Sequence, residues 1–479
     1  MSNGPVAYAT GHFCVWNDVR ASIVYWLTAR MVAIPDLSAS TRSHESSILC
    51  ASTPPILSHP YELAVAQMNT FRFARDNARW LAAGILLTWS SSFGQTYFIS
   101  LSAGDIREAF NLSHGEWGGI YTIGTTISAI LLVQIGWVAD RLRVRTLALF
   151  VLIGFVSMCV AMAYVSHWLV LIGIVAGLRF CGQGMMSHLA LTAMGRWFRA
   201  QRGRAVAIGS LGFALGEALL PMLFVAIAAT VGWRGSWLLA AASLVFFTTP
   251  LLMYLLHRER TPQSLAVHEH TPGIGGRHWE RKEAVRHWLI WVLLPGIMAP
   301  SFMITSLFFH QVHLTGIKGW QLSSYVAVYP LYSLIIVTCN LAAGILIDRF
   351  GSARLLPFYL LPLAVGLALF GLFSGFWVAV VGLSFLAIGQ GGAHSLLGSI
   401  WPEYYGTRHL GAIRALVVAF TVAASAIGPG ITGWLIDVGV GFEAQCVAMA
   451  LYLVIVSAVF AVVARSVSAM KPSNPETAG

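Results

Sequence analysis

The chain has 479 residues, of which 57% are hydrophobic and 10% are charged, and it carries a formal net charge of +10 at pH 7. A soluble globular domain has about 25% charged residues, so this composition excludes an ordinary soluble protein and indicates a membrane protein. The basic surplus does not indicate nucleic-acid binding, because nearly all Lys and Arg residues fall in the connections between apolar stretches.

Residues 1–71 differ from everything that follows. Residues 1–67 are rich in Ser, Thr and Pro, and their one apolar patch, 21–34, is interrupted by Arg30 and ended by Pro35. The order of a secretory signal peptide is missing. We therefore expect 1–71 to be a disordered extension. Met68 opens a short basic lead into the first apolar stretch, so we also expect it to be the native start.

Twelve apolar stretches follow, each close to the length of about 20 residues that crosses a bilayer as a helix. They are residues 79–100, 115–137, 146–165, 168–192, 203–229, 235–257, 287–309, 321–347, 353–374, 376–399, 409–436 and 442–465. The six cysteines show no metal-ligand spacing. The sequence therefore predicts an all-α membrane protein with twelve transmembrane helices and no bound metal.

The basic residues fix the expected orientation. After residue 71, 22 Lys and Arg residues lie at the beginning, in alternate connections and in the tail, against three on the other side: Arg107, Arg234 and Lys318. Basic residues mark the cytoplasmic side. Both termini and the connection at 258–286 are therefore predicted to be cytoplasmic, in a plasma (inner) membrane protein.

An internal repeat divides the chain into halves. Residues Trp80, Gly136, Asp140 and Pro221 have identical partners 208 positions later. A repeat of this length indicates two equivalent bundles. We expect six-helix bundles at 72–257 and 287–466, a charged linker at 258–286 and a tail at 467–479.

The repeat includes a short basic motif. It reads GWVADRLRVR at 136–145 and GILIDRFGSAR at 344–354, and the fourth predicted helix carries GLRFCGQG at 177–184. With the two halves, these motifs resemble the major facilitator superfamily of secondary transporters. The N-terminal copy departs from the family pattern at Arg143 and Val144. The stretch RWFRAQRGRAVAIG at 196–209 is similar to monocarboxylate and oxalate/formate-type carriers.

The resemblance implies a transporter, not an enzyme, that needs no cofactor and works by alternating access. In this family the first, fourth, seventh and tenth helices line the path, which directs attention to Gln95, Tyr97, Arg179 and His394. The motif residues Asp140 and Arg141, with Asp348 and Arg349 in the second copy, are then candidates for a cytoplasmic gate; a simple loop salt bridge is the alternative.

Two charges lie inside predicted spans. Arg179 is in the fourth helix and Glu217 in the fifth, at similar expected depth. A charge within the bilayer is costly and is a functional-site hypothesis by default. Glu217 is a candidate proton carrier and Arg179 a candidate anion-binding residue. A permanent ion pair between them is the structural alternative.

Uncharged polar residues complete the candidate site. His188 and His394 follow matching Gly-Gln-Gly runs in the two halves, and Asn340 lies in the eighth helix. Hydrogen-bonded histidines without a ligand are the alternative for the histidine pair. His310 and His313, at the outer end of the seventh helix, are expected to be solvated.

The sequence thus predicts a monomer in the lipid bilayer that moves a small organic anion, such as a monocarboxylate, by proton coupling or exchange. Efflux of drugs or amphiphiles is a second hypothesis. A transporter-derived sensor or assembly factor is a third, from another class.

Overall fold

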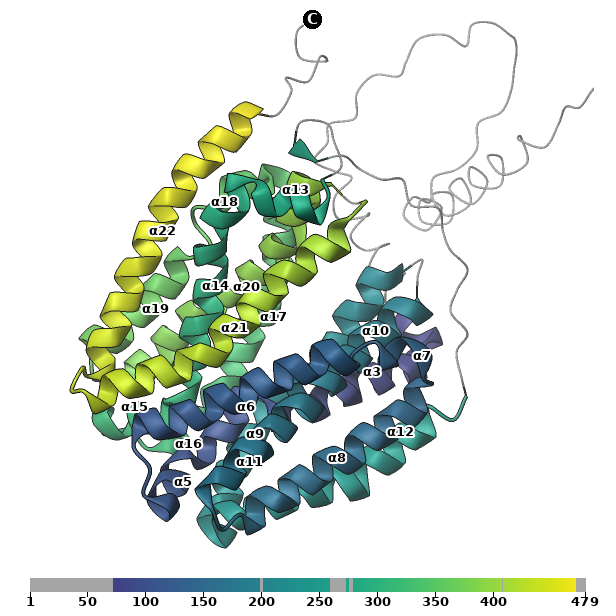
Figure 1. Ribbon diagram of the computed structural model, residues 1–479, viewed down its shortest axis with the longest axis vertical. Helices are drawn as coiled ribbons and strands as arrows, with labels where there is room; N and C mark the ends of the chain where they lie inside the picture. Colours follow the sequence, from purple (N-terminus) through teal and green to yellow (C-terminus); the bar gives the residue numbers. More distant parts are fainter. Residues whose placement is uncertain (1–71, 199–200, 259–272, 275–278, 407, 471–479) are drawn as a thin grey trace, which may run out of the picture. The chain divides into compact units, whose positions relative to one another are not determined.

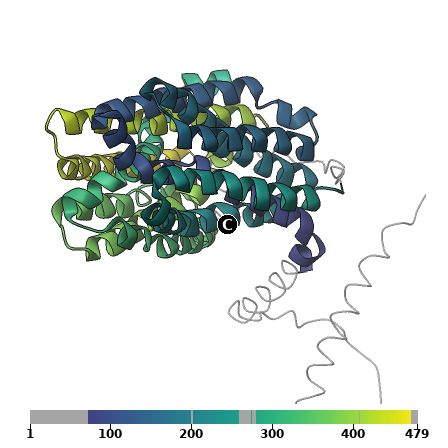
Figure 2. The same ribbon diagram turned by 90° about the horizontal axis from the view of Figure 1, so that it is seen from below.

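The computed structural model describes residues 72–198, 201–258, 273–274, 279–406 and 408–470. The predicted extension at 1–71, most of the linker and the last nine residues lie outside this described part. Every long segment within it is helical, and it holds no strand (Figures 1 and 2). This is the all-helical fold that the apolar pattern predicts.

After the helical residues 72–76, the N-terminal bundle contains ten further α-helical segments, counted over its described residues. They are α3 (Ala78–Ser91), α4 (Thr96–Ile99), α5 (Ala103–Phe110), α6 (His114–Ile135), α7 (Val138–Arg141), α8 (Val144–Tyr164), α9 (Trp168–Leu178), α10 (Ser187–Trp197), α11 (Arg202–Ser243) and α12 (Thr249–Leu255). The short segments η1 (Ser92–Gly94), η2 (Ser100–Ser102), η3 (Arg179–Met186) and η5 (Leu244–Thr248) join some of them.

The C-terminal bundle also contains ten, counted in the same way. They are α13 (Arg281–Arg286), α14 (Trp288–Phe309), α15 (Gln311–Lys318), α16 (Leu322–Val326), α17 (Tyr329–Phe350), α18 (Ser352–Leu355), α19 (Leu361–Leu372), α20 (Trp377–Tyr405), α21 (Leu410–Asp437) and α22 (Phe442–Met470).

Nine helices in the described part are long and apolar enough to cross a membrane. One of them, Arg202–Leu255, has 54 residues. Its backbone turns at Gly232, where φ is +73°, so it comprises the fifth and sixth predicted spans. Glycine suits this position because other residues are strained at positive φ. The two remaining predicted spans are the interrupted helix α3–α4 and the shorter α19.

Each bundle has two ends, which we name by the chain segments they carry. The linker face is the end where α12 finishes and α13 begins. The far face is the opposite end, where α5 and α15 lie (Figure 1).

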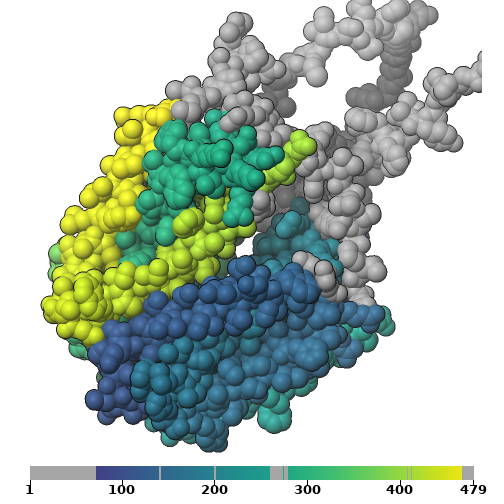
Figure 3. Space-filling view, in the orientation of Figure 1, coloured from purple at the N-terminus to yellow at the C-terminus, as the bar shows by residue number. Residues whose placement is uncertain are grey.

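The bundles contact each other at the far face. Ser113 opens α6 with a capping box, its Oγ accepting from Glu116 N at 3.0 Å. Asp437, the last residue of α21, accepts from the same Ser113 Oγ at 2.7 Å and from His114 N and Gly115 N at 3.1 and 2.7 Å. One bundle therefore caps a helix of the other. In Figure 3, α6 and α21 touch at these ends and separate towards the linker face.

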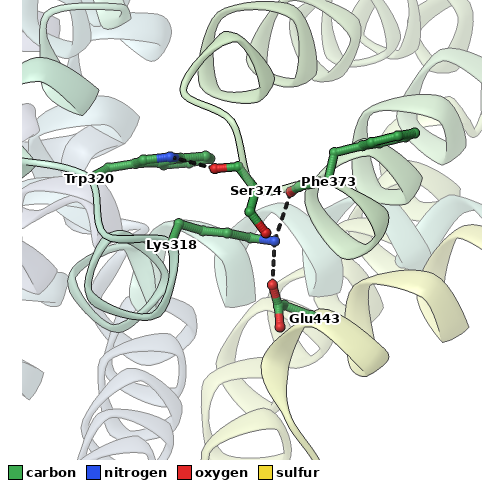
Figure 4. A network of polar contacts seen from close by, with 5 residues as sticks. All are labelled: Lys318, Trp320, Phe373, Ser374 and Glu443. Atoms are coloured by element: carbon green, nitrogen blue, oxygen red, sulfur yellow. Dashed lines mark hydrogen bonds and ion pairs between the residues drawn. The ribbon is translucent and has the colours of Figure 1, made fainter.

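A polar network ties the far-face end of the C-terminal bundle together (Figure 4). The side chain of Lys318, 1% exposed, forms an ion pair with Glu443 at the start of α22. Lys318 Nζ also donates to Phe373 O at 2.8 Å, and Trp320 Nε1 donates to Ser374 O at 2.9 Å. These bonds attach the end of α15 to the turn after α19 and to α22, within its own bundle.

Candidate functional site

The first predicted span is interrupted in the half that lies nearer the far face. Its α3 ends at Ser91, and Gln95 adopts an extended backbone (φ −83°, ψ 155°) before α4 begins. Gly94 lies against the backbone of Gly182 in η3, and a Cβ on Gly94 would be 2.8 Å from Gly182 Cα. The close approach of two glycines brings the interrupted backbone next to the fourth helix.

Arg179 is held at this interruption. Arg179 is the first residue of the π-helical stretch η3 and is only 1% exposed. Nη1 donates to Gly94 O and to Thr96 Oγ1, both at 3.3 Å, and the guanidinium lies 5.4 Å from the ring centroid of Tyr121. The Tyr121 hydroxyl is 2.5 Å from Thr96 Oγ1. Within the described residues, Arg179 has no carboxylate partner and its buried Nε has no hydrogen bond.

Glu217 belongs to a different cluster. It is half-buried on α11 and lies beside Ser333 of α17, in the other bundle. The phenols of Tyr97, Tyr329 and Tyr332 are close enough to interact with it electrostatically. No ion pair joins it to Arg179 in the described part of the chain. The structure therefore does not contain the permanent Arg179–Glu217 ion pair that was the structural alternative.

The tenth helix adds polar groups near this cluster. Tyr332 donates to Gln390 Oε1 at 2.9 Å. His394 lies one turn beyond Gln390 and is exposed, although it sits in the middle of α20. Asn340 is also exposed, and its Oδ1 accepts from Ser395 Oγ at 2.6 Å. Helices α17 and α20 therefore present amides and an imidazole beside one another.

The two candidate histidines differ in their surroundings, since His394 is exposed and His188 is not. His188 is half-buried and lies nine residues past Arg179, about 13 Å along the helix towards the linker face. Its Nε2 is 3.9 Å from where a Cβ on Gly136 would lie, so it is next to the end of α6. Gln95 is half-buried at the helix interruption, two residues before Tyr97.

The gating candidates lie at the linker face. The side chains of Asp140 and Arg141 are outside the described residues. The backbone beside them is held, because Ala139 O accepts from Arg196 Nη1 at 3.0 Å. Asp348 and Arg349 are exposed in the last turn of α17. Their gating role stays a prediction.

A group of histidines lies at the far face, between the bundles. His114 is 3.0 Å from Arg107 Nη1, and its ring centroid is 4.2 Å from that of His313. His310 is 3% exposed, and its Nε2 is 2.9 Å from Thr432 Oγ1. The expectation that His310 is solvated is therefore wrong, because the far-face contact of the bundles covers it. His313 is half-buried.

Burial sets the protonation of these far-face groups. It lowers the pKa of His310 to about 3, despite the opposing hydrogen bond to Pro429 O, and the nearby histidines and Arg107 add to the lowering. Burial, and then Arg107, lower the pKa of His313. Burial also lowers the pKa of Arg107. The closed far face thus favours neutral imidazoles.

Sequence reasoning missed four residues that make polar contacts between these elements: Thr96, Tyr121, Asp437 and Gln311, whose Nε2 donates to Tyr97 O and Ser100 Oγ of the N-terminal bundle. The first two are polar side chains in apolar spans, which is a detectable signal. Gln311 and Asp437 lie at helix ends, where polar residues are ordinary. Their partners in the N-terminal bundle come from the packing of one bundle on the other, which the sequence does not show.

An all-helical membrane protein with buried ionisable groups between two helical bundles has the architecture of a secondary transporter. The family model described as Major Facilitator Superfamily matches residues 84–337 and 309–479. The chain belongs to the Major Facilitator Superfamily and is a secondary transporter.

One curated relative is a probable sulfoacetate transporter, SauU, of Cupriavidus necator. It is 25% identical over 264 residues, which are 54% of this chain and 58% of the relative. The match thus spans less than two thirds of that protein.

Solved structures share the fold. A bacterial homolog of the human lysosomal transporter Spinster, inward-facing and unoccupied, aligns with a TM-score of 0.65 at 16% identity, covering 83% of this chain and 98% of that one. Its inward-facing occupied form gives 0.64 at 17%, covering 82% and 98%. The nucleoside transporter NupG gives 0.59 at 12%, covering 82% and 100%.

Proposed function

We propose that the chain transports a small organic anion, such as a monocarboxylate or a sulfonated carboxylate, and that Arg179 binds its anionic group. The observation that carries this is the buried guanidinium without a carboxylate partner, whose Nε is left without a hydrogen bond. A buried charge needs a partner, and a planar guanidinium suits a carboxylate or sulfonate. The name of the Cupriavidus necator relative describes a substrate of this kind.

Transport is coupled to protons or to exchange, and Glu217 is the proton carrier. Its carboxyl group lies on α11 beside Ser333 of the opposite bundle, with phenols around it and no cation partner among the described residues. A carboxylate in such surroundings is stabilised by binding a proton, and separating the bundles would expose it to water. Its position makes it sensitive to the movement that alternating access requires.

The orientation follows from the basic residues. The linker face carries the Lys and Arg surplus and is the cytoplasmic side of a plasma (inner) membrane, and the far face is outside. The far-face contacts then close the outer side. Asp348, Arg349 and the Asp140–Arg141 pair act at the cytoplasmic side, and the working unit is a monomer.

Uptake of labelled sulfoacetate and a panel of monocarboxylates into proteoliposomes tests the substrate. Arg179→Gln should lower uptake by about tenfold or more, since hydrogen bonds to charged groups contribute about 1.5–3 kcal/mol. Arg204→Gln, at the exposed linker-face start of α11, is the control. Unchanged uptake by folded Arg179→Gln contradicts the anion site.

Glu217→Gln tests the coupling in the same vesicles. It should keep counterflow of substrate and lose uptake driven by a pH gradient. Proton-driven uptake at the wild-type rate removes Glu217 from the mechanism. Movement of cationic amphiphiles in place of anions favours the efflux hypothesis, and binding without movement favours a sensor.

A further inference from the structure

The side-chain amide of Gln311 forms hydrogen bonds with both bundles. It is the first residue of α15 and is fully buried, with 0% exposure. Its Nε2 donates to Tyr97 O at 2.8 Å and to Ser100 Oγ at 2.7 Å, both in the N-terminal bundle. Its Oε1 accepts from the hydroxyl of Tyr329 in its own bundle. Both amide hydrogens and the carbonyl oxygen are therefore used.

A second bond crosses the same contact in the opposite direction. Ser100 Oγ donates to Phe308 O of α14 at 2.7 Å. Each bundle thus offers one backbone carbonyl to a side chain of the other, in an environment without solvent. Buried polar groups left without partners are costly, so these bonds are strongly preferred wherever the bundles touch.

The hydrogen-bond partners of Gln311 connect it to the residues around Arg179 and to those around Glu217. On one side, Tyr97 follows directly after Thr96, the hydroxyl that accepts from Arg179 Nη1. On the other side, Tyr329 lies within electrostatic range of Glu217. The chain of contacts therefore runs from the Arg179 site through one amide to the Glu217 site.

We propose that Gln311 is the positioning residue that latches the far face closed and makes this closure depend on the backbone that holds Arg179. The latch itself rests only on the bonds between the bundles. Its link to anion and proton binding rests on the function proposed above. When the far face opens, both Nε2 bonds must break together, and the freed Tyr97 and Ser100 groups must find water.

Gln445 provides a matched control. It is also a buried glutamine, 4% exposed, whose Nε2 donates to two acceptors, Thr432 O at 3.2 Å and Val440 O at 2.9 Å. Both acceptors belong to its own bundle. Gln445→Leu and Gln311→Leu therefore each remove two bonds donated by a buried amide, and Gln311→Leu also removes the acceptor of the Tyr329 hydroxyl. Only Gln311→Leu removes bonds between the bundles.

The experiment measures the distance between spin labels on the far face of the full chain. Labels at Ala109→Cys and Ile317→Cys, exposed positions on α5 and α15, report one bundle against the other. The six native cysteines are first replaced by alanine. Spectra are recorded without substrate, so the result does not depend on knowing it.

Gln311→Leu should shift the ratio of short to long distances towards the open form by about tenfold or more, the size expected from losing bonds that exist only in the closed state. Gln445→Leu should leave the ratio unchanged. A Gln311→Leu distribution equal to that of the unsubstituted chain overturns the latch, as does an equal shift in both variants.

Gln311→Glu keeps the proposal testable if Gln311→Leu does not fold. A protonated carboxyl can donate one bond and accept another, whereas the carboxylate repels the Tyr97 carbonyl. The short distance should therefore dominate at low pH and be lost as pH rises. This direction is opposite to the one expected of the unsubstituted chain, in which burial lowers the pKa of His310 and His313 and so favours the closed face when these histidines are neutral. A pH-independent closed population in this variant contradicts the latch.

Transport then separates the latch from the proposed function. Gln311→Leu should lower the maximal rate of uptake more than it raises KM, because it changes the balance of conformations and leaves the Arg179 side chain in place. If no anion is moved by any variant while the distances shift as expected, the anion hypothesis fails and the latch stands.

Discussion

At the scale of single residues, the burial of polar groups carries the most information. Arg179, His310 and Gln311 are each less than 5% exposed, yet each is held differently. His310 and Gln311 have hydrogen-bond partners for the atoms that face the other helices. Arg179 keeps Nε unpaired. The difference separates two residues whose polar atoms are satisfied within the protein from the one that we propose binds the anion.

His310 makes stability depend on pH. Burial lowers its pKa to about 3, whereas an unfolded histidine titrates near 6.5. Between these values the unfolded chain binds the additional proton, so stability should fall as pH drops below about 6.5, by about 1.4 kcal/mol per pH unit. Thermal unfolding at pH 5 and pH 8 should show a smaller pH difference in His310→Gln than in the unsubstituted chain.

His167→Gln is the control for this measurement, because His167 is exposed in the turn before α9. It should keep the pH difference of the unsubstituted chain. An equal pH difference in His310→Gln would show that the neutral imidazole contributes nothing to folding.

At the scale of elements, the interruption of the first helix and the π-helical stretch of the fourth fit together. Gly94 and Gly182 lie in contact where the two irregularities meet, and Gly94 O is then free to accept from Arg179. A regular helix would use that carbonyl internally. The irregular backbone is thus part of the proposed anion site.

Gly182→Ala should disturb the site without touching a charged group. Its Cβ would lie 2.6 Å from Gly94 Cα and 2.7 Å from Phe155 Cζ, too close for either to remain in place. Overpacking of this kind costs about 1–3 kcal/mol. We expect substrate affinity, measured by uptake KM in proteoliposomes, to weaken as α3 and α4 move away from Arg179.

Gly173→Ala belongs to the same predicted span and has nothing within 4 Å of the added Cβ. It should leave uptake unchanged. If the two alanine variants transport alike, the Gly94–Gly182 contact does not position Arg179.

The sequence predicts elements better than their interruptions. All twelve apolar stretches contain helices, because hydrophobic length alone determines them. Arg179 and Glu217 stand out because charge is rare in such stretches. The extended backbone at Gln95 and the pairing of Thr96 and Tyr121 with Arg179 cannot be predicted from the sequence, because they depend on which helices lie together. The role of Asp437 could not be predicted for the same reason, because it ends its own helix and the N–H groups that it caps belong to the other bundle.

At the scale of the whole described unit, the far face is closed by contacts that neither bundle can make alone. Asp437 of α21 caps the first turn of α6, and Thr122 Oγ1 of α6 donates to Ala426 O of α21 at 2.8 Å. Anions stabilise helix N-termini. The cap exists only while the bundles are in contact at the far face, so it stabilises the closed state.

Removing this cap should favour the open far face. Asp437→Asn keeps the size of the side chain but loses the charge and at least one acceptor, at a cost of about 0.5–2 kcal/mol, the usual range for helix caps. That corresponds to a shift of roughly 2- to 30-fold between closed and open forms. The spin-label pair on α5 and α15 should report longer distances, and the exchange of substrate across the membrane should slow.

Asp105→Asn is the matched control, because Asp105 is exposed in the first turn of α5 and stabilises a helix of its own bundle. It should leave the distances as they are. Combined with Gln311→Leu, Asp437→Asn should add its shift nearly in full, since the cap and the latch involve different helices and share no partner. Distances in Asp437→Asn that match those of Asp105→Asn would mean that the cap orders a helix end without holding the bundles together.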